Sequence, residues 1–297
     1  MKTIFRFTMF LMLMVILLGI PMISHANNYT FSFFDYPGAT DTRPNSINRS
    51  GKIVGDYGNW THGFTYEAGV AASLDFSGSP WSFAYGINTQ GHVAGVYQFN
   101  ATSNYSYIYD GNSFTSFHYY GANKTHAGGI NDKNHIVGHI DDGLQGFFYD
   151  SVAQTFDLFV YPGGVLQTRP SGINNNGVIS GYYIDNTDKS HGFFKDGAVF
   201  TSIDYPGALN TYPIGINNYG AMVGSYDITP GGVRYGFIYK NGVFTPFNIP
   251  GYTNINARGI TDDGRIVGRA RAANGNSHGF LATPPKITPI MNLLLGD

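Results

Sequence analysis

A phrase built around the dipeptide Ile-Asn recurs along most of this 297-residue chain at intervals of 40 to 44 residues. Its six copies are centred on Ile47, Ile87, Ile130, Ile173, Ile216 and Ile260. In every copy a Gly follows the Asn (Thr in the sixth) by seven residues, and five copies carry a Gly-Phe pair further on. A near-constant period of this length indicates a repeat architecture, in which each unit buries its apolar face against its neighbours.

Each copy holds four short candidate strands separated by turn residues. The second is an apolar run such as Ile53-Val54, and the third carries the Gly-Phe pair, as in Gly146-Phe147. Only one of the 19 acidic residues is Glu (Glu67), and the chain has 40 Gly, which together disfavour helices. Four strands in about 43 residues is the size of one propeller blade. We therefore predict an all-β, six-bladed β-propeller with four strands per blade; two tandem β-trefoils are the alternative.

The phase of the repeat predicts how the propeller closes. The chain opens on a fourth-strand sequence, Thr30 to Tyr36, and the last copy stops after a third-strand sequence, His278 to Leu281. The N-terminal strand can therefore serve as the outer strand of the last blade, which leaves no unpaired strand edge. Two tandem trefoils give no reason for this offset.

The N-terminal 26 residues have the pattern of a secretory signal peptide. Lys2 and Arg6 precede an apolar run from Phe7 to Ile20, and small residues follow at Ser24-His25-Ala26. That run is shorter than the roughly 20 residues of a membrane span. We expect a signal peptide (1–26), a propeller (27–284) and a short C-terminal tail (285–297). The protein should be periplasmic, on the cell surface or extracellular, without stable membrane insertion after cleavage.

Charge and cysteine content exclude several functions. Without Lys2 and Arg6 the chain keeps 15 basic and 19 acidic residues, so its weak negative charge offers nothing to nucleic acid. The absence of Cys excludes disulfides and thiolate chemistry. We expect no cofactor.

The repeated phrase resembles the HAF-type repeats of bacterial extracellular proteins. The best copies run from Gly172-Ile173-Asn174 to His191-Gly192-Phe193 and from Gly259-Ile260 to His278-Gly279-Phe280. The chain has Gly where the family typically has Ala. The resemblance implies a bacterial exported repeat protein and carries no catalytic residues to this sequence.

The loops between second and third strands, and those between blades, are long and variable, and in a propeller they share one face. Variable loops on a rigid scaffold are a common place for function. The residues four positions before each repeat Ile should surround one mouth of the central channel, and we predict a ligand-binding site there, formed by Arg43, Phe83, His126, Arg169, Tyr212 and Asn256. These side chains could instead only cap the loops. Peripheral aromatics that suit a stacked ligand are Trp60, Trp81 and Tyr252.

Metal and catalytic sites find little support. The turn Thr261-Asp262-Asp263-Gly264 has oxygen ligands, but most copies carry too few carboxylates for calcium, so we interpret these residues as turn formers. A zinc site from the third-copy histidines is disfavoured; these are His118, His126, His135 and His139. We predict no metal and no catalytic residue. The recurring histidines should be structural donors at strand starts (His62, His191, His278), and the recurring aspartates should stabilise turns (Asp35, Asp75, Asp204).

The sequence thus favours a secreted, non-enzymatic binding or surface-interaction module that uses the loop-rich propeller face. A carbohydrate or an extracellular protein could be the partner. One alternative is an extracellular hydrolase or lyase acting on polysaccharide or a small ester, which would need ionisable side chains within hydrogen-bond reach of each other. The other is a purely structural surface protein.

Overall fold

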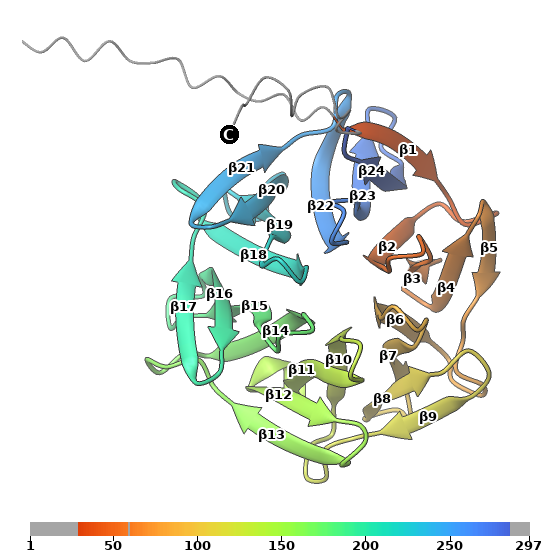
Figure 1. Cartoon of the computed structure of the whole chain (residues 1–297), viewed down its shortest axis with the longest axis vertical. Helices are drawn as coiled ribbons and strands as arrows, with labels where there is room; N and C mark the ends of the chain where they lie inside the picture. Colours follow the sequence, from red (N-terminus) through yellow and green to blue (C-terminus); the bar gives the residue numbers. More distant parts are fainter. Residues whose placement is uncertain (1–28, 59, 286–297) are drawn as a thin grey trace, which may run out of the picture.

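Six four-stranded antiparallel sheets surround a central axis in the computed structural model, which describes residues 29–58 and 60–285 (Figure 1). The predicted signal peptide and nearly all of the predicted tail lie outside the described residues. One 3-10 helix, η1 (Asp141–Gly143), accompanies the 24 strands. The predicted six-bladed β-propeller is therefore confirmed, and the two-trefoil alternative is wrong.

Within each blade the strands are ordered from the centre outward. Blade 1 comprises β2 (Thr42–Ile47), β3 (Ile53–Tyr57), β4 (His62–Glu67) and β5 (Val70–Ser73). Blade 2 comprises β6 (Ser82–Ile87), β7 (Val93–Gln98), β8 (Asn104–Tyr109) and β9 (Phe114–Phe117). Blade 3 comprises β10 (Thr125–Ile130), β11 (His135–Ile140), β12 (Gln145–Asp150) and β13 (Thr155–Phe159).

The second half of the chain repeats this order. Blade 4 comprises β14 (Gln167–Ile173), β15 (Ile179–Ile184), β16 (Ser190–Asp196) and β17 (Val199–Ile203). Blade 5 comprises β18 (Asn210–Ile216), β19 (Met222–Asp227), β20 (Tyr235–Lys240) and β21 (Val243–Phe247). Blade 6 comprises β22 (Tyr252–Ile260), β23 (Ile266–Ala272) and β24 (Ser277–Thr283), with β1 (Thr30–Phe34) as its outer strand.

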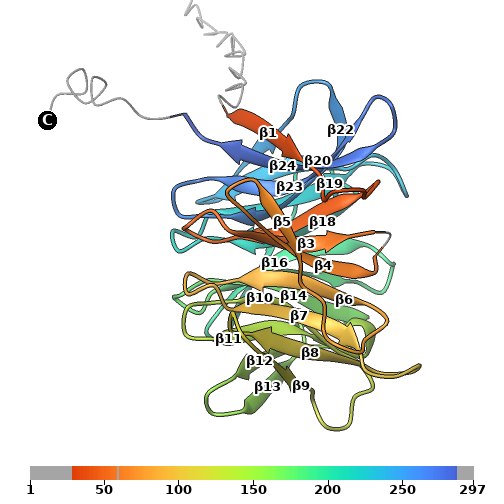
Figure 2. The same ribbon diagram turned by 90° about the vertical axis from the view of Figure 1, so that its right-hand side faces the viewer.

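Strand β1 closes the circle of blades, as the repeat phase predicts. It pairs antiparallel with β24, so that Phe33 lies opposite Phe280 (Figures 1 and 2). Its aromatic side chains reach both neighbouring blades: Phe34 stacks on Tyr66 of blade 1 at 4.2 Å, and Phe31 contacts Phe247 of blade 5 at 6.0 Å. Both are half-buried, because β1 is the outermost strand of its blade. The closing strand therefore ties three blades together.

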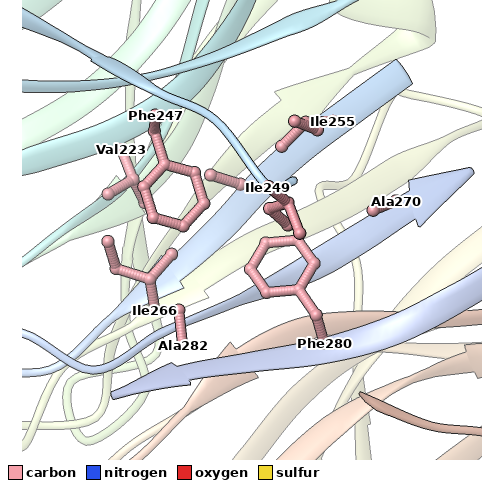
Figure 3. Packing of buried hydrophobic residues seen from close by; sticks show 9 residues of the cluster. Val223, Phe247, Ile249, Ile255, Ile266, Ala270, Phe280 and Ala282 are labelled. Atoms are coloured by element: carbon pink, nitrogen blue, oxygen red, sulfur yellow. The ribbon is translucent and has the colours of Figure 1, made fainter. Parts of the chain in front are cut away.

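The aromatic residue of the Gly-Phe pair occupies the same place in every blade. It lies on the third strand and is almost fully buried between adjacent sheets, at Phe64, Tyr107, Phe147, Phe193, Phe237 and Phe280. Figure 3 shows the core between blades 5 and 6, where Phe280 packs near Phe247 and Ile249. Burial of one such side chain contributes about 1.5–3 kcal/mol, so this repeated position is a main source of blade-to-blade cohesion.

A β-bulge interrupts every innermost strand two residues before the repeat Ile. The bulged residues are Asn45, Tyr85, Gly128, Ser171, Ile214 and Arg258. A bulge leaves its extra residue unpaired and turns its side chain in a new direction. The repeat Gly on the neighbouring strand pairs with the residue just before the bulge, as Gly268 does with Ala257. A Cβ at Gly268 would overlap the main-chain oxygen of Asn256, which explains the need for Gly there.

The Asn of the Ile-Asn phrase links adjacent blades. In five blades its Nδ2 donates to the main-chain oxygen of the equivalent residue in the next blade at 3.0–3.2 Å, and the donors are Asn48, Asn88, Asn131, Asn174 and Asn217. In blade 6 this residue is Thr261, and Arg265 closes the circle by donating from Nη2 to the Arg49 oxygen at 2.7 Å. The same Asn also shapes its own turn, since Asn131 Oδ1 accepts from the His135 N–H.

The recurring His and Asp contact each other in the three blades that carry both. Nδ1 of His62, His191 and His278 lies 2.7–3.0 Å from an oxygen of Asp75, Asp204 and Asp35, respectively. In blade 2 both positions have changed, and Tyr105 stacks on His118 at 4.1 Å instead. The histidines therefore have structural contacts at strand starts, as predicted, and the aspartates join the third strand to the end of the fourth.

The His191 contacts predict a pH-dependent stability. Burial lowers the pKa of His191, but hydrogen bonds and charges from Asp204 and Asp185 outweigh it, so the pKa is raised overall. The imidazolium can donate from both nitrogens, to Asp204 at 2.9 Å and to Asp185 at 3.2 Å. A raised native pKa stabilises the fold below the ordinary value of about 6.5, and this gain is lost as pH rises through the native pKa.

We expect His191→Gln, which places the side chain of the equivalent Gln145 of blade 3 in blade 4, to remove this pH dependence. Urea unfolding measures the free energy of unfolding of the native protein and of the variant at each pH. The native protein's advantage in this free energy should be roughly 0.2–1 kcal/mol larger at pH 5.5 than at pH 9. The effect is small because exposed ion pairs are screened. Both pH values keep the aspartates ionised. An equal difference at the two pH values would contradict this assignment.

No helix among the described residues is both long and apolar enough to cross a membrane.

Candidate functional site

The innermost strands enclose a cavity of about 310 Å³, here called the channel cavity. All six bulged residues line it. The six repeat Ile residues line both this cavity and a smaller one of about 90 Å³ at the opposite mouth. Five of these Ile expose only 5–9% of their surface. Because all six line both cavities, they form an apolar collar between them, and the mouth of the channel cavity lies on one side of this collar.

The open mouth lies on the loop-rich face. Arg169, which lines the cavity, donates from Nη2 to the Asp142 oxygen in η1, between the second and third strands of blade 3. Arg234, in the corresponding loop of blade 5, lines the cavity as well and lies over the Tyr212 side chain at 4.4 Å. Long loops thus supply side chains to this mouth.

Three of the six predicted mouth residues line the channel cavity: His126, Arg169 and Tyr212. The other three do not. Arg43 is buried in ion pairs with Asp41 and with Asp56, the latter at 2.9 Å. Asn256 is also buried, and its Oδ1 accepts from Ser225 at 3.1 Å and from Arg234 at 3.3 Å. Phe83 belongs to an aromatic group described below. The ligand-binding role of all six stays a prediction.

Two sets of cavity residues were missed by the sequence analysis. One is the set of bulged residues, above all Tyr85 and Arg258. The other set follows the repeat Gly by one residue, and two of its members line the cavity: His139, which pairs with His126, and Tyr182, which pairs with Arg169. In both sets the residue type differs from copy to copy, although the repeat Ile lies two residues after the first set and the repeat Gly one residue before the second. That contrast was the available signal.

Among the charged residues that line the cavity, Arg258 is the one whose guanidinium has no hydrogen-bond partner in the described part of the chain. Its guanidinium makes no hydrogen bond or ion pair within residues 29–58 and 60–285, and its Nε is buried without a hydrogen-bond partner. Burial lowers the pKa of Arg258, and the negative charge of Asp56 opposes this effect. An arginine nevertheless stays protonated in proteins. Arg258 is half-buried in the cavity wall. Because a charge that is partly removed from water and has no partner is costly, an anion would be its complementary ligand.

The nearby carboxylate of Asp56 is hydrogen-bonded to other residues. It accepts hydrogen bonds from Arg43 Nη1 and from Asn45 Nδ2, both at 2.9 Å. Burial raises the pKa of Asp56, while Asn45 and Arg43 oppose that rise. Asp56 does not line the channel cavity, and neither does any other Asp or Glu of the described residues. The lining is therefore cationic overall, through Arg169, Arg234 and Arg258.

The two histidines of the cavity wall are neutral. Burial lowers the pKa of His126 to about 4, and it also holds the pKa of His139 well below its usual range. Their side chains lie 5.2 Å apart between centroids. Asn104 Nδ2 lies 3.3 Å from His126 Nε2, and because an amide nitrogen can only donate, Nε2 is the acceptor. His118 and His135 lie elsewhere: His118 stacks on Tyr105, and His135 contacts Phe148.

An aromatic group, here called the mouth cluster, comprises Trp60, Trp81 and Phe83. Trp81 stacks on Phe83 at 4.8 Å, and Trp60 meets the edge of Phe83 at 6.4 Å. Trp60 is 52% exposed and covers the guanidinium of Arg43. Phe83 also contacts Tyr85 at 6.1 Å, so the cluster continues into the channel cavity. The third peripheral aromatic, Tyr252, lies apart from it, stacked on Phe33 of the closing strand.

Among the described residues, no group of three or more His, Cys, Asp or Glu could hold a metal ion. The oxygens of the repeat turns serve contacts between blades, as when Asp132 Oδ1 accepts from the Thr89 N–H at 2.9 Å.

Fold and site together define a six-bladed β-propeller with a cationic central cavity. No family model matches the sequence, and no curated protein matches it. Among solved structures, the chain is similar to virginiamycin B lyase from Staphylococcus aureus, with a TM-score of 0.52, 10% identity and coverage of 85% of this chain and 99% of that one.

Two lectin structures are comparably similar. The SapL1 lectin in complex with alpha methyl fucoside gives a TM-score of 0.52 at 11% identity and covers 84% of this chain and 98% of its own. The Aleuria aurantia fungal lectin, described as a six-bladed β-propeller, gives 0.50 at 9% identity, with coverage of 88% and 98%. At these identities the likeness shows the shared fold alone.

Proposed function

We propose that this chain is a secreted, non-enzymatic binding module that takes a carbohydrate at the mouth of its channel cavity. The observation that carries the proposal is the mouth cluster, where an exposed Trp60 adjoins a cavity rich in hydrogen-bond donors. Aromatic faces stack on the apolar faces of sugars, and a few polar groups then fix the orientation. That two propellers of similar shape are lectins is in keeping with this proposal.

The side chains of the cavity wall favour binding over catalysis. A hydrolase or lyase needs ionisable groups within hydrogen-bond reach of each other. His126 hydrogen-bonds Asn104, and Arg234 hydrogen-bonds Asn256, but within the described part of the chain no two ionisable groups of the wall hydrogen-bond each other. The proposal also includes export through the signal peptide (1–26) and membership of the HAF-type repeat proteins, both of which rest on sequence patterns.

A glycan array tests this proposal with the native chain and the variants Trp60→Ala and Trp81→Ala. We expect the native chain to retain a defined set of glycans and each variant to lose at least about 5-fold in affinity, equivalent to about 1 kcal/mol of stacking. Tyr219→Ala is the matched control, because Tyr219 is an exposed aromatic in a repeat turn on the opposite face.

A native chain that retains no glycan would overturn the carbohydrate proposal. Glycan binding that both Trp variants keep at full strength would exclude the mouth cluster as the site. Arg43→Ala is unsuitable for this test, because it would leave the buried Asp56 without its ion pair.

A further inference from the structure

The channel cavity has a charge pattern that a neutral sugar would not need. Three arginines face it from different blades: Arg169 on β14, Arg234 before β20 and Arg258 on β22. Arg169 donates to Gln167 at 2.8 Å and to a main-chain oxygen, and Arg234 donates to the Asn256 amide. None of the three pairs with a carboxylate of the described residues. Their charges are therefore uncompensated by the wall of the cavity.

We propose that the channel cavity binds the carboxylate of an acidic sugar, a hexuronate unit, with Arg258 as its principal ligand. This inference rests on the proposed carbohydrate function and names the class of sugar. A guanidinium binds a carboxylate through two parallel hydrogen bonds, and the two terminal nitrogens of Arg258, which have no hydrogen-bond partner among the described residues and are not among the buried atoms, can make them. Because Tyr85 lines the cavity and contacts Phe83 of the mouth cluster, one unit of a glycan can stack on the cluster while a neighbouring uronate unit occupies the cavity.

The surroundings of Arg258 keep it free for such a ligand. Asp56 is held by Arg43 and Asn45, as described above, and therefore does not pair with Arg258. Tyr85 can donate its hydroxyl, since burial and the charge of Asp56 raise its pKa and keep it protonated. The volume of about 310 Å³ is at the small end of the range for ligand pockets, which fits a single sugar unit.

Titration calorimetry with two matched pairs of probes tests this inference: galacturonate against galactose, and glucuronate against glucose. At least one uronate should bind the native chain about 10- to 100-fold more tightly than its neutral partner, as expected for a charge-assisted hydrogen bond. In Arg258→Gln this preference should fall to about 2-fold or less, and in Arg258→Lys it should be partly retained. Arg49→Gln, at the opposite mouth, should keep the full preference.

The stability of Arg258→Gln supplies a second readout. Because the guanidinium has no partner in the described residues, its removal should leave the melting temperature unchanged or raise it. A marked drop in melting temperature would show that Arg258 is structural and would overturn the assignment.

The binding outcomes separate the two proposals. If galactose and glucose both bind as tightly as their uronates, this inference fails and the carbohydrate function stands. If acetate or inorganic phosphate binds as tightly as the uronates, the site takes a free anion, and the acidic-sugar proposal fails. If no probe binds and the array is also blank, both proposals fail.

Discussion

A chain that begins at Gly38, and therefore lacks β1, is expected to lose its cooperative unfolding transition and to aggregate. The deletion removes half-buried aromatics at Phe31, Phe34 and Tyr36, the last of which stacks on Tyr57. At about 1 kcal/mol for each half-buried ring, plus the lost strand ladder, the cost approaches the 5–15 kcal/mol that holds a typical domain together. The deletion also exposes the edge of β24, which can then pair with other chains.

Calorimetry and light scattering measure both effects, and a chain that begins at Tyr29 is the matched control. We expect this longer chain to unfold cooperatively. A synthetic peptide that covers residues 29–38 should restore part of the transition when it is added to the truncated chain. Cooperative melting of the truncated chain at the native temperature would contradict a closing role for β1.

Gly268→Ala is expected to cost at least about 3 kcal/mol of unfolding free energy, at the upper end of overpacking effects. All three nearest atoms to the added Cβ are main-chain atoms, including the oxygen of Asn256 and the Cα of Ala257, so no side-chain rotation can relieve the overlap. The backbone of the bulge would have to move instead. For a chain of this size the melting temperature should fall by roughly 6–12 °C.

Gly177→Ala separates this overlap from ordinary glycine effects. Gly177 has a φ of +84° in a turn, and nothing lies within 4 Å of an added Cβ. Ala at this position is therefore destabilising only through its unfavourable backbone conformation. We expect about 1 kcal/mol at Gly177. A loss at Gly268 as small as the loss at Gly177 would show that the bulge adapts, and it would refute our account of the repeat Gly.

The fold could be predicted because the repeat shows both the four-stranded unit and the offset between the repeat copies and the blades. The position of Phe34 at the start and of Phe280 near the end is enough to place β1 beside β24, since any other arrangement leaves an unpaired edge. The Asn of the Ile-Asn phrase could have been assigned to its turn, but its bond to the next blade depends on how closely two sheets approach. The distance between adjacent sheets is set by the arrangement of all six blades, so it cannot be derived from one copy of the repeat.

The site was less predictable, because the surroundings of a side chain depend on the neighbouring strand and on a local irregularity. Arg43 and Arg169 hold equivalent places on their strands. Arg43 nevertheless pairs with Asp56 on the neighbouring strand, whereas Arg169 lies opposite Tyr182 and lines the cavity. Arg258 lines the cavity from the bulge itself, and no sequence pattern marks a bulge of this kind. The contact of Tyr252 with Phe33 could not be predicted either, because the two residues are more than 200 positions apart in the chain.

The isoleucine collar favours entry of a polymer by its end. The carboxylates of a uronate polymer that threaded from one face to the other would have to pass six apolar side chains, which is unfavourable, whereas a terminal unit can reach the channel cavity from its mouth. Avidity for such a polymer should then scale with the number of its chain ends rather than with its mass. Limited fragmentation of a uronate polymer, which multiplies termini at constant weight, should make it a better competitor.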